Sequence, residues 1–561
     1  MKLVGHFILY AAMLAACSCV ASLDGPSGPT LLSVSPTSGA TGVSVSVQIV
    51  AEFSENISPA SATTGTFYLR ENGSDSNIGG TITVSGSTVS FQPSENLDYS
   101  KIYNATLSGD ISNLTDTSMA SDYAWSFETA TGTVTKWITS YGRTLPEIFY
   151  NGIQTSDGGF LGVGSAEGDD GFLYGLAVKL DLSGEIEWSY SYGKSIADQV
   201  FYSVIESDDG FLFAGYTNSY SAFGDSSAWV VKVDPAGEIV WQNAYDIALD
   251  DEEFRSIVES SDGEYFVSGS TFSGAGGPAL LAKIDSSDGS IIWDASYATG
   301  SNFSAANSYP TSDGGIVFTG LSKTSGIEGP LALVAKLDMN GLVVWDQEYG
   351  DLVAKEETGV AIRPITGGGY VFVAQSDSFG FTNGGGLIVE IDATGTIQRQ
   401  KVIGSDDGIF LISDLALTDD GGYLVSGAYD TNYSFYHSVL LKLDSSFDVD
   451  WQKSYGFTNL HTNSLLAGIG QTDDGGYMSF GSTSQYGYGD FDAWAMVIDS
   501  DGNCGDDCEL IADSNFVVND VAISSKMLGL FRIPSVLTEI PTNVILGLSS
   551  LESETQCFDF D

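Results

Sequence analysis

The sequence has few basic residues. Lys and Arg number 20 among 561 residues, against 73 Asp and Glu, which gives a formal net charge of -53 at pH 7. Such a surface repels phosphate backbones, so nucleic acid is excluded from the expected partners. Two explanations of the acidity stay open, namely solubility in a salty medium and the binding of divalent cations by some of the carboxylates. Ca²⁺ is therefore the one cofactor that the composition leaves open.

Cysteine is also scarce. No Cys lies between Cys19 and Cys504, so the main body of the fold does not depend on disulfides. Cys504, Cys508 and Cys557 could form one bridge in an exported region of the chain. Metal–thiolate binding is the weaker alternative, because the Cys-x3-Cys spacing has neither a partner pair nor a nearby His.

Residues that would support catalysis are few. The chain has three His, of which His437 and His461 lie outside the N-terminal segment. Neither belongs to a Ser or Cys nucleophile motif, and neither Gly-x-Ser-x-Gly nor His-Glu-x-x-His occurs. Paired carboxylates in acidic loops could still hydrolyse glycosides. We therefore expect no catalytic residues, with a secreted glycan-active enzyme as the alternative.

Long apolar runs are confined to the N-terminus, where the run from Phe7 to Ala16 follows Lys2. The run is too short for a membrane-spanning helix and predicts a signal peptide over residues 1–16, followed by a linker over 17–28. Leu14-Ala15-Ala16-Cys17 resembles the bacterial lipobox, which implies lipidation of Cys17 and attachment to a membrane through the lipid. Ser18, not Asp, follows this Cys, and by analogy with enteric bacteria that favours the outer membrane or cell surface. An ordinary secreted protein cleaved nearby is the alternative.

The chain is rich in one internal repeat. A block that ends in Lys-x-Asp, a tight turn and Trp recurs at intervals of 51 to 55 residues. Its aspartates are Asp181, Asp234, Asp285, Asp338, Asp392, Asp444 and Asp499. In the first copy, the Asp-Gly-Gly turn at 157–159 and the Lys-x-Asp turn at 179–184 separate β-rich runs and give four short strands per block. Four-stranded blades with this period predict a β-propeller.

The Trp of the fourth strand predicts how the ring closes. Five copies carry it, as Trp188, Trp241, Trp293, Trp345 and Trp451. Arg399 replaces it in copy five, and copy seven has no fourth strand. Trp137 precedes the first block with the same flanking residues, so the strand around it should complete blade seven. Residues 131–508 are thus expected to form a seven-bladed propeller closed by an N-terminal strand.

The repeated side chains are expected to build the scaffold. The Trp residues should pack between blades. Each Asp should cap the turn that follows it. Five copies place a Lys two residues before the Asp and on the same face of the strand, so we expect a local ion pair between the two. These are Lys179, Lys232, Lys283, Lys336 and Lys442. Asp499–Asn503 resembles a calcium loop, but it occupies the ordinary turn position of copy seven.

Residues 29–130 alternate in short strands and turns, which is typical of a β-sandwich. The segments 35–43, 53–55, 91–93 and 125–127 resemble landmarks of the bacterial Ig-like domain of S-layer and surface proteins. That resemblance implies a spacer without catalytic residues. The repeat itself resembles Asp-Gly-Gly/Lys-x-Asp/Trp propellers of bacterial secreted proteins. The fold class is all-β, with this Ig-like sandwich followed by the propeller. Residues 509–561 form a C-terminal extension, expected to be β-rich, for which we predict no role.

The loops opposite the repeated turns vary in length and chemistry, and variable loops on a rigid frame commonly bind ligands. Aromatic and acidic residues gather there and would suit sugars, sometimes with Ca²⁺. The candidate rim comprises Asp169, Asp170, Tyr220, Phe223, Asp250, Asp251, Glu252, Glu253, Phe379, Phe381, Tyr433, Phe435, Tyr486 and Tyr488. Solvated loops with partly buried rings are the alternative.

Together these features predict a non-catalytic cell-surface lipoprotein. Its propeller would act as a binding, adhesion or scaffold module for a carbohydrate or protein ligand, carried on an Ig-like spacer. The sequence predicts neither the identity of the ligand nor the oligomeric state.

Overall fold

The computed structural model of the chain is all-β in its described part and divides into two compact units, Met1–Ala130 and Thr131–Asp561. No helix long and apolar enough to cross a membrane is found among the described residues. The structure describes residues 28–558 except 44–46, 75, 95–96, 99–100, 130–134, 195, 220–224, 247–250, 273–276, 299–302, 324–328, 352–355, 380, 382–383, 431–435, 457–463, 485–489, 505–510, 515, 522–523, 527–530, 534–537, 542–544 and 549–551.

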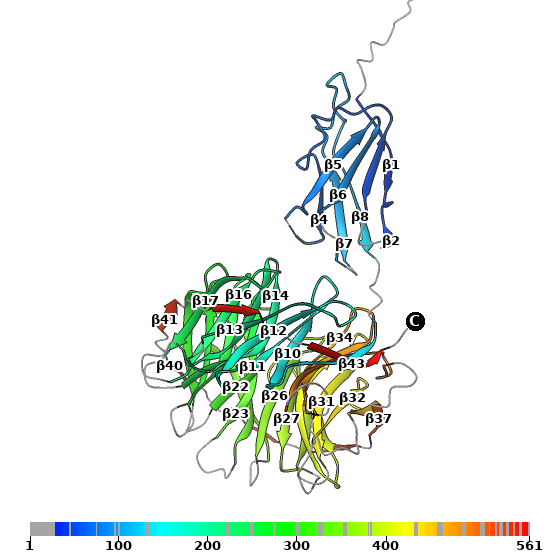
Figure 1. Cartoon of the computed structure of the whole chain (residues 1–561). Helices are drawn as coiled ribbons and strands as arrows, with labels where there is room; N and C mark the ends of the chain where they lie inside the picture. The colour runs from blue at the N-terminus through cyan, green and yellow to red at the C-terminus, as the bar shows by residue number, and fades with distance from the viewer. Residues whose placement is uncertain are drawn as a thin grey trace, which may run out of the picture. The chain divides into compact units, whose positions relative to one another are not determined.

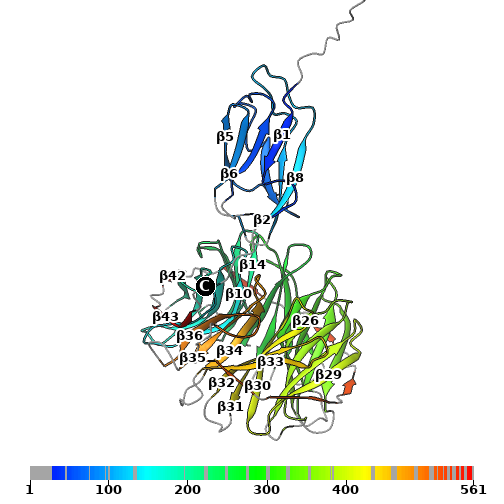
Figure 2. The same ribbon diagram turned by 90° about the vertical axis from the view of Figure 1, so that its right-hand side faces the viewer.

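The first unit is a sandwich of two four-stranded sheets, labelled in Figures 1 and 2. One sheet has the order β1 (Leu31–Ser35), β3 (Ile49–Phe53), β6 (Thr88–Pro93), β5 (Gly80–Ser85). The other has the order β2 (Ala40–Val43), β8 (Tyr123–Thr129), β7 (Ile102–Leu107), β4 (Phe67–Glu71). Every second residue of β6 and β7 is buried, because each sheet buries one face. The core includes Phe67, Phe91 and Trp125, and the Trp125 indole N–H donates to the Pro36 carbonyl at 2.9 Å.

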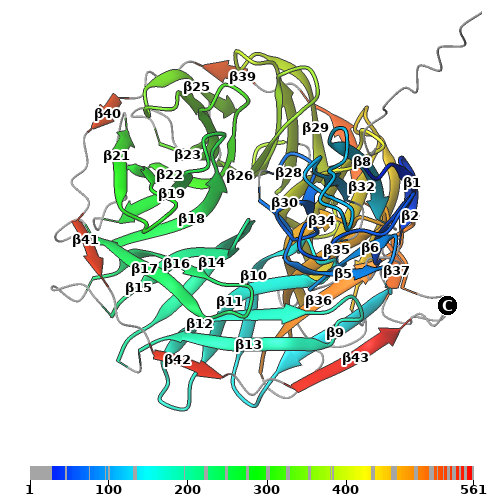
Figure 3. The ribbon, with the colours of Figure 1, turned by 90° about the horizontal axis from the view of Figure 1, so that it is seen from above.

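The second unit contains seven five-stranded sheets arranged in a ring, here called blades 1 to 7 (Figure 3). The first four strands of each blade follow one another from the centre outward, except in blade 7, whose fourth strand is β9. In order, these strands are β10 (Glu147–Gln154), β11 (Phe160–Glu167), β12 (Leu173–Leu180) and β13 (Ile186–Gly193); β14 (Gln199–Ser207), β15 (Gly210–Thr217), β16 (Ser227–Val233) and β17 (Ile239–Asp246); β18 (Asp251–Glu259), β19 (Tyr265–Phe272), β20 (Ala279–Ile284) and β21 (Ile291–Ala298); β22 (Phe303–Pro310), β23 (Ile316–Ser322), β24 (Leu331–Leu337) and β25 (Val343–Gly350); β26 (Glu357–Pro364), β27 (Tyr370–Ser376), β28 (Gly385–Ile391) and β29 (Ile397–Gly404); β30 (Ile409–Leu417), β31 (Tyr423–Asp430), β32 (His437–Leu443) and β33 (Val449–Tyr455); and β34 (Ser464–Gln471), β35 (Tyr477–Thr483), β36 (Asp492–Ile498) and β9 (Trp137–Gly142).

Strand β9 confirms the predicted closing strand. It pairs antiparallel with β36, with Trp137 opposite Val497. Blade 7 then packs on blade 1. The Phe149 and Phe480 rings lie 5.6 Å apart between centroids, and the Asp473 backbone N–H donates to Gln154 Oε1 at 2.9 Å. The last blade is therefore built from both ends of the propeller sequence.

The fifth strand of each blade comes from the C-terminal extension and corrects the prediction of four strands. The strands are β37 (Ile511–Asp513), β38 (Val517–Asp520), β39 (Ser524–Lys526), β40 (Phe531–Ile533), β41 (Thr538–Pro541), β42 (Ile545–Leu548) and β43 (Glu552–Phe558). They pair with the outer strands of blades 6, 5, 4, 3, 2, 1 and 7, in that order. We call β37–β43 the belt; its last five strands lie at the periphery of the ring in Figure 3. Strands β37 to β42, of three or four residues each, are too short for an alternating pattern to predict their positions.

Candidate functional site

The innermost strand of every blade contains a β-bulge at the same position. The pairing with the second strand skips one residue in each blade, which leaves that residue without a partner opposite. The skipped residues of blades 1 to 7 are Tyr150, Tyr202, Arg255, Ala306, Val360, Ser413 and Ala467. Bulges bend a strand and re-aim its side chain, and they are frequent beside functional sites. All seven of these residues line one central cavity.

The cavity has a volume of about 710 Å³, within the usual range for small-ligand sites. Its wall is uneven, because blades 1 to 3 contribute Tyr, Tyr and Arg at the bulge whereas blades 4 to 7 contribute Ala, Val, Ser and Ala. A second row, two residues earlier in six of the strands, also lines it. This row consists of Ile148, Glu253, Ser304, Thr358, Leu411 and Leu465. The cavity thus has one bulky wall and one wall of small residues.

The bulky wall is a linked group of rings and charges. The Tyr150 and Tyr202 rings meet edge to face, with centroids 5.4 Å apart. The Arg255 guanidinium lies over the Tyr202 ring at 4.0 Å, and its Nε donates to Glu253 Oε1 at 2.6 Å. Burial lowers the pKa of Arg255, but the Glu253 carboxylate outweighs it, so the net shift is upward. Burial also raises the pKa of the Tyr202 hydroxyl. The wall therefore presents phenol groups and a charge-compensated ion pair.

A polar network joins the blades behind the opposite wall. Arg363 donates to Asn307 Oδ1 at 2.8 Å and to Asp414 Oδ1 at 3.0 Å. Asn307 and Asp414 each follow a bulged residue and accept a backbone N–H of the next blade, from Ile362 and Ile469, at 3.2 Å each. Burial raises the pKa of Asp414 and outweighs the Arg363 charge, which lowers it. These contacts fix the relative positions of blades 4 to 7 at the cavity.

The cavity lies toward the variable loops. Each bulge falls at or before the middle of its strand, whose first residues follow those loops. The second-strand residues Ser270, Leu321, Ala428 and Ser482 that line the cavity lie near the loop ends of their strands. The repeated turns are at the other end. The site therefore lies on the side of the ring that the sequence favoured, but mainly in residues that the sequence analysis did not select.

Seven of the predicted rim residues lie outside the described residues: Tyr220, Phe223, Asp250, Tyr433, Phe435, Tyr486 and Tyr488. Of the others, Glu253 lines the cavity. Asp169 is exposed, as is Asp170, which accepts from the Tyr174 hydroxyl at 2.7 Å, and the exposed Asp251 accepts from the Ser226 backbone N–H at 2.7 Å.

Three rim assignments are corrected. Glu252 is fully buried, because strand alternation turns it away from the face that Glu253 occupies. Phe381 is buried in the core around blades 4 and 5, and the half-buried Phe379 packs against the same core. These rings serve packing, since apolar side chains in the loop between β27 and β28 of blade 5 are stabilised by entering the core that blades 4 and 5 share.

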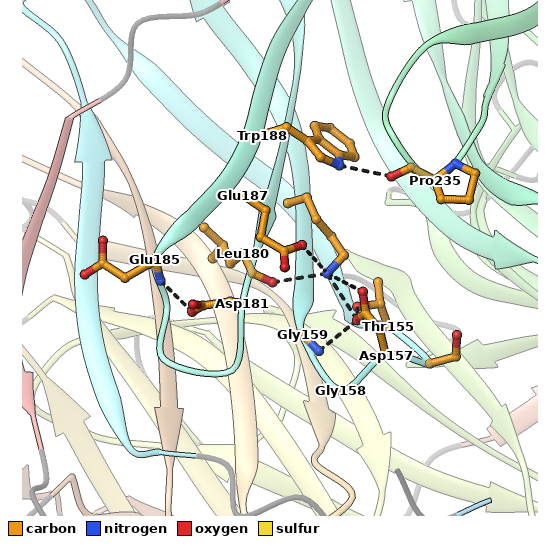
Figure 4. Close-up of polar contacts among 12 residues, drawn as sticks. Thr155, Asp157, Gly158, Gly159, Leu180, Asp181, Glu185, Glu187, Trp188 and Pro235 are labelled. Atoms are coloured by element: carbon orange, nitrogen blue, oxygen red, sulfur yellow. Dashed lines mark hydrogen bonds and ion pairs between the residues drawn. The ribbon is translucent and has the colours of Figure 1, made fainter. Parts of the chain in front are cut away.

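The repeated Asp caps its turn. In blade 1, Asp181 Oδ1 accepts from the backbone N–H of Ser183 at 2.8 Å. It also accepts from the backbone N–H of Glu185 at 3.0 Å (Figure 4). Asp234, Asp285, Asp338, Asp392, Asp444 and Asp499 make equivalent bonds.

The repeated Lys does not pair with this Asp, which corrects the prediction. Lys179 Nζ lies 2.9 Å from Asp157 of the other turn and 3.1 Å from Glu187 (Figure 4). The same cross-turn pair joins Lys232 to Asp209, Lys283 to Asp262, Lys336 to Asp313 and Lys442 to Asp420. The side chain reaches across the strand pair because the two turns lie at the same end of the blade.

The two exceptional blades follow the same rule. Blade 5 has Gly367 in place of the turn Asp, and its Lys position holds Glu390, which pairs with Arg399. Blade 7 keeps the turn Asp as Asp474 but has Val497 at the Lys position, and Lys136 beside the closing strand supplies the cation at 2.6 Å. The Lys is thus a partner of the Asp-Gly-Gly turn.

The Trp residues link neighbouring blades. The Trp188 indole N–H donates to the Pro235 carbonyl in the turn of blade 2, at 3.1 Å (Figure 4). Trp137, Trp241, Trp293, Trp345 and Trp451 make the equivalent bond to the next blade. A Tyr four residues later adds a second bond, as from the Tyr192 hydroxyl to the Gly237 carbonyl at 2.8 Å. These residues hold the ring together and lie outside the cavity.

Neither the disulfide nor the lipid prediction is tested. Cys504 is buried, Cys508 lies outside the described residues, and Cys557 is placed by its backbone pairing opposite Ile138. Cys17 also lies outside the described residues. Among the described residues, no group of three or more His, Cys, Asp or Glu side chains could hold a metal ion.

The cavity residues carry a sequence signal that the Asp, Lys and Trp of the repeat do not reveal. Each bulged residue stands five positions before the first residue of the turn, for example Tyr150 before Thr155 and Ala467 before Thr472. Within a regular repeat, this is a fixed position whose chemistry changes from Tyr to Arg to Ala. A position that recurs in every blade but whose residue type varies between blades is a candidate for binding a specific ligand.

Fold and site together define an Ig-like sandwich followed by a propeller with a central cavity. Residues 26–129 match the family model of the bacterial Ig-like domain, and residues 226–409 match the model described as outer membrane protein assembly factor BamB. No curated protein matches the chain.

Several solved structures are similar at low identity. A protein of unknown function from Bacteroides caccae has 13% identity and a TM-score of 0.31, covering 52% of this chain and 92% of its own. Sqt1 of Chaetomium thermophilum, bound to the N-terminus of ribosomal protein L10, has 11% identity and a TM-score of 0.36, covering 65% and 97%. The N-terminal part of the bacterial S-layer protein SbsC has 15% identity and a TM-score of 0.16, covering 38% and 42%.

Proposed function

We propose that this chain is a non-catalytic bacterial surface protein whose propeller binds a ligand in the central cavity. The observation that carries the proposal is the asymmetry of the seven bulged positions. A purely structural ring would be served by similar residues at equivalent places, whereas this ring gathers Tyr150, Tyr202 and Arg255 on one side and small residues on the other. Scaffold positions of the repeat are shared by most blades, as the capping Asp is by all seven, whereas the bulged positions differ in size and charge.

The proposed surface location rests on the N-terminal sequence and the family matches. The lipobox-like segment 14–17 supports a lipid anchor on Cys17. The two matched models describe a bacterial Ig-like domain and an outer membrane assembly factor, which supports association with the bacterial surface or outer membrane. The Ig-like unit would serve as a spacer. Mass spectrometry of the mature N-terminus tests the anchor, which is rejected if the first residue is not a modified Cys17.

Filling the cavity tests the binding role. Ala306→Trp and Ala467→Trp place large rings on the small-residue wall, and Val240→Trp places one at an exposed position of β17 as a matched control. Labelled full-length protein is added to isolated cell envelopes, and the melting temperature of each variant is measured in parallel. We expect saturable binding that both cavity variants lose and the control keeps. Equal binding by all variants, or none by the wild type, contradicts the proposal.

The same assay distinguishes the enzyme alternative. Binding without release of soluble fragments agrees with a binding module. Release of glycan fragments that stops on substitution of a carboxylate pair would replace this proposal with a glycan-active enzyme.

A further inference from the structure

We infer that the cavity takes a neutral saccharide, with one sugar ring against Tyr150 and its hydroxyl groups at the Glu253–Arg255 pair. This inference rests on the proposed function and goes further by naming the chemical class of the ligand. Three features of the cavity carry it: an aromatic surface, an ion pair that is internally neutral, and room on the opposite wall.

The aromatic surface comes from blade 1. Tyr150 is half-buried and lines the cavity, while the neighbouring Tyr202 ring is covered by the Arg255 guanidinium at 4.0 Å. Tyr150 is therefore the ring available to a ligand. The C–H face of a sugar ring is apolar and flat enough to pack against such a ring, while its hydroxyls point sideways toward polar groups.

The polar groups adjoin Tyr202, whose ring meets that of Tyr150 edge to face at 5.4 Å between centroids, and they match a pair of hydroxyls. Arg255 uses Nε for Glu253, which leaves its two Nη groups as donors, and its side chain is 41% exposed. The Glu253 carboxylate has further acceptor capacity. Donors and acceptors side by side suit neighbouring hydroxyls, each of which both donates and accepts.

Charge favours a neutral ligand over an anionic or cationic one. The positive charge of Arg255 is compensated by Glu253 at 2.6 Å, so the pair offers no net charge to a ligand. An anionic ligand would also be repelled by a chain with a formal net charge of -53. A cation would compete with Arg255 for the same carboxylate.

The opposite wall leaves space and adds hydroxyls. Ala306, Val360 and Ala467 are small or short, and Ser304, Thr358 and Ser413 contribute hydroxyl groups to the lining. Leu411 and Leu465 of the second row add apolar side chains to the lining. Hydroxyls interleaved with apolar side chains match the alternating polar and apolar surface of a saccharide.

The experiment measures binding of defined probes to the full-length protein by calorimetry. The probes are neutral gluco-, galacto- and N-acetylglucosamine trisaccharides, an acidic uronate trisaccharide, and uncharged and acidic hexapeptides. We expect a neutral trisaccharide to bind the wild type. Its affinity for Tyr150→Ala and for Glu253→Gln should be at least tenfold lower than for the wild type. Tyr309→Ala is the matched control, since Tyr309 lies on the inner strand β22 but does not line the cavity. Its affinity should be unchanged, and the melting temperatures of all variants verify folding.

The other outcomes separate this inference from the proposed function. Saccharide binding that Tyr150→Ala leaves unchanged overturns the inference, because the site is then elsewhere. Cavity-dependent binding of an acidic saccharide or a peptide overturns the ligand class and leaves the proposed function standing. If no probe binds but Ala467→Trp still abolishes binding to envelopes, the ligand class is again overturned and the proposed function stands. Absence of both overturns the inference and the proposed function together.

Discussion

At the scale of single residues, the scaffold depends on buried lysines whose carboxylate partners remain in contact with solvent. The Lys442 side chain is 3% exposed, whereas that of its partner Asp420 is 60% exposed. The ammonium is satisfied by Asp420 at 2.8 Å, Asp450 at 3.3 Å and the Leu443 carbonyl at 3.2 Å. An ammonium in such a place is tolerated because every donor has an acceptor.

Replacing this lysine should destabilise the propeller. Lys442→Met keeps the buried stem but removes charge-assisted hydrogen bonds, which typically contribute roughly 1.5–3 kcal/mol. Chemical denaturation measures the loss. Lys323→Met is the control, because Lys323 has no ion pair among the described residues, and it should change stability by less than about 0.5 kcal/mol. An equal effect of the two substitutions would refute the role of the cross-turn pair.

The same pair predicts a dependence on acid. Burial raises the pKa of Asp420, but the bonds from Lys442 and Thr418 outweigh it and lower the pKa to about 2. A carboxyl whose folded pKa lies below its unfolded value stabilises the fold above the unfolded pKa. That contribution is lost as the pH falls from about 4 to about 2. Lys442→Met should therefore lose less stability than the wild type across this window.

Glu357 predicts the opposite dependence. Burial raises its pKa to about 7, although the hydroxyls of Ser376 and Ser378 and the Asp351 backbone N–H donate to it and lower the value. The folded state then holds more protons than the unfolded state between pH 4.5 and about 7, so this group's contribution to stability falls as the pH rises through that window.

Glu357→Gln isolates this effect, because the amide keeps the shape without titrating. Free energies of unfolding are compared at pH 5 and pH 7.5 for both proteins. A shift of this size corresponds to about 3 kcal/mol, so the wild type should lose up to that much more than the variant. Identical changes with pH in the two proteins would exclude Glu357 as the source.

At the scale of elements, one blade junction is built differently from the others. Where other blades place Trp, blade 5 has Arg399, which donates to the Ser445 carbonyl of blade 6. The turn it reaches has Phe447 with φ 63° where the other six blades have glycine. Arg399 lies 4.7 Å from the Phe447 ring, which packs against Tyr423. At this junction the aromatic side chain is therefore contributed by the turn of blade 6 and not by the fourth strand of blade 5.

A double-mutant cycle tests this exchange. Arg399→Trp adds a ring where Phe447 already fills the space, and Phe447→Gly removes a fully buried side chain, so each single substitution should be destabilising. The double variant restores the common pattern, and it should be more stable than the sum of the single effects by about 0.5–3 kcal/mol. Phe447→Gly combined with the distant Tyr245→Phe is the control and should be additive. Additivity in the test cycle as well would contradict the exchange.

The sequence predicted those strands that belong to the repeated blocks. The seven blocks predicted the blades, and Trp137 predicted the closing strand β9, because a missing strand and a spare one are visible in a regular pattern. The bulges were not predictable from alternation, since one extra residue shifts every later side chain to the other face. The partner of the repeated Lys was not predicted, because the Lys-x-Asp spacing along a strand does not determine which turn the long Lys side chain reaches.

The belt also has a period much shorter than that of the blades, so the blade repeat does not predict it. Strands β38 to β43 begin at residues 517, 524, 531, 538, 545 and 552, one every seven residues. In the sequence, an apolar residue stands before each of these starts: Phe516, Ile523, Leu530, Leu537, Val544 and Leu551. Seven residues is thus the length of chain from one blade to the next, and the propeller contains two repeats that run in opposite directions around it.

At the scale of the whole propeller unit, the belt covers the outer edge of all seven blades. Exposed edge strands carry unpaired backbone groups and promote association between chains. Each outer strand here pairs with a belt strand, as Tyr192 does with Leu546 in blade 1. Side chains also hold the belt where it passes from blade 6 to blade 5, between β37 and β38. Phe516 is 6% exposed and packs on Phe410 and Tyr429, and its backbone N–H donates to Gln452 Oε1 at 3.0 Å.

A chain ending at residue 508 should therefore be less stable and prone to self-association, because seven edges become exposed at once. Melting temperature and light scattering are the measurements. Phe516→Ala is the matched variant, since it removes one anchor but keeps every edge covered, and it should lower stability by about 3–5 kcal/mol without causing association. A truncated chain that melts like the full chain and stays monomeric would contradict the role of the belt.

Cleavage after folding separates this role from an effect on folding itself. A protease site inserted between Cys504 and Ile511 allows the belt to be cut in the folded protein. If backbone pairing with seven blades holds the belt, the cut segment should remain bound through gel filtration and separate only in denaturant. Its release on cutting, with an intact and monomeric ring left behind, would show that the belt is dispensable and that the first four strands of each blade suffice.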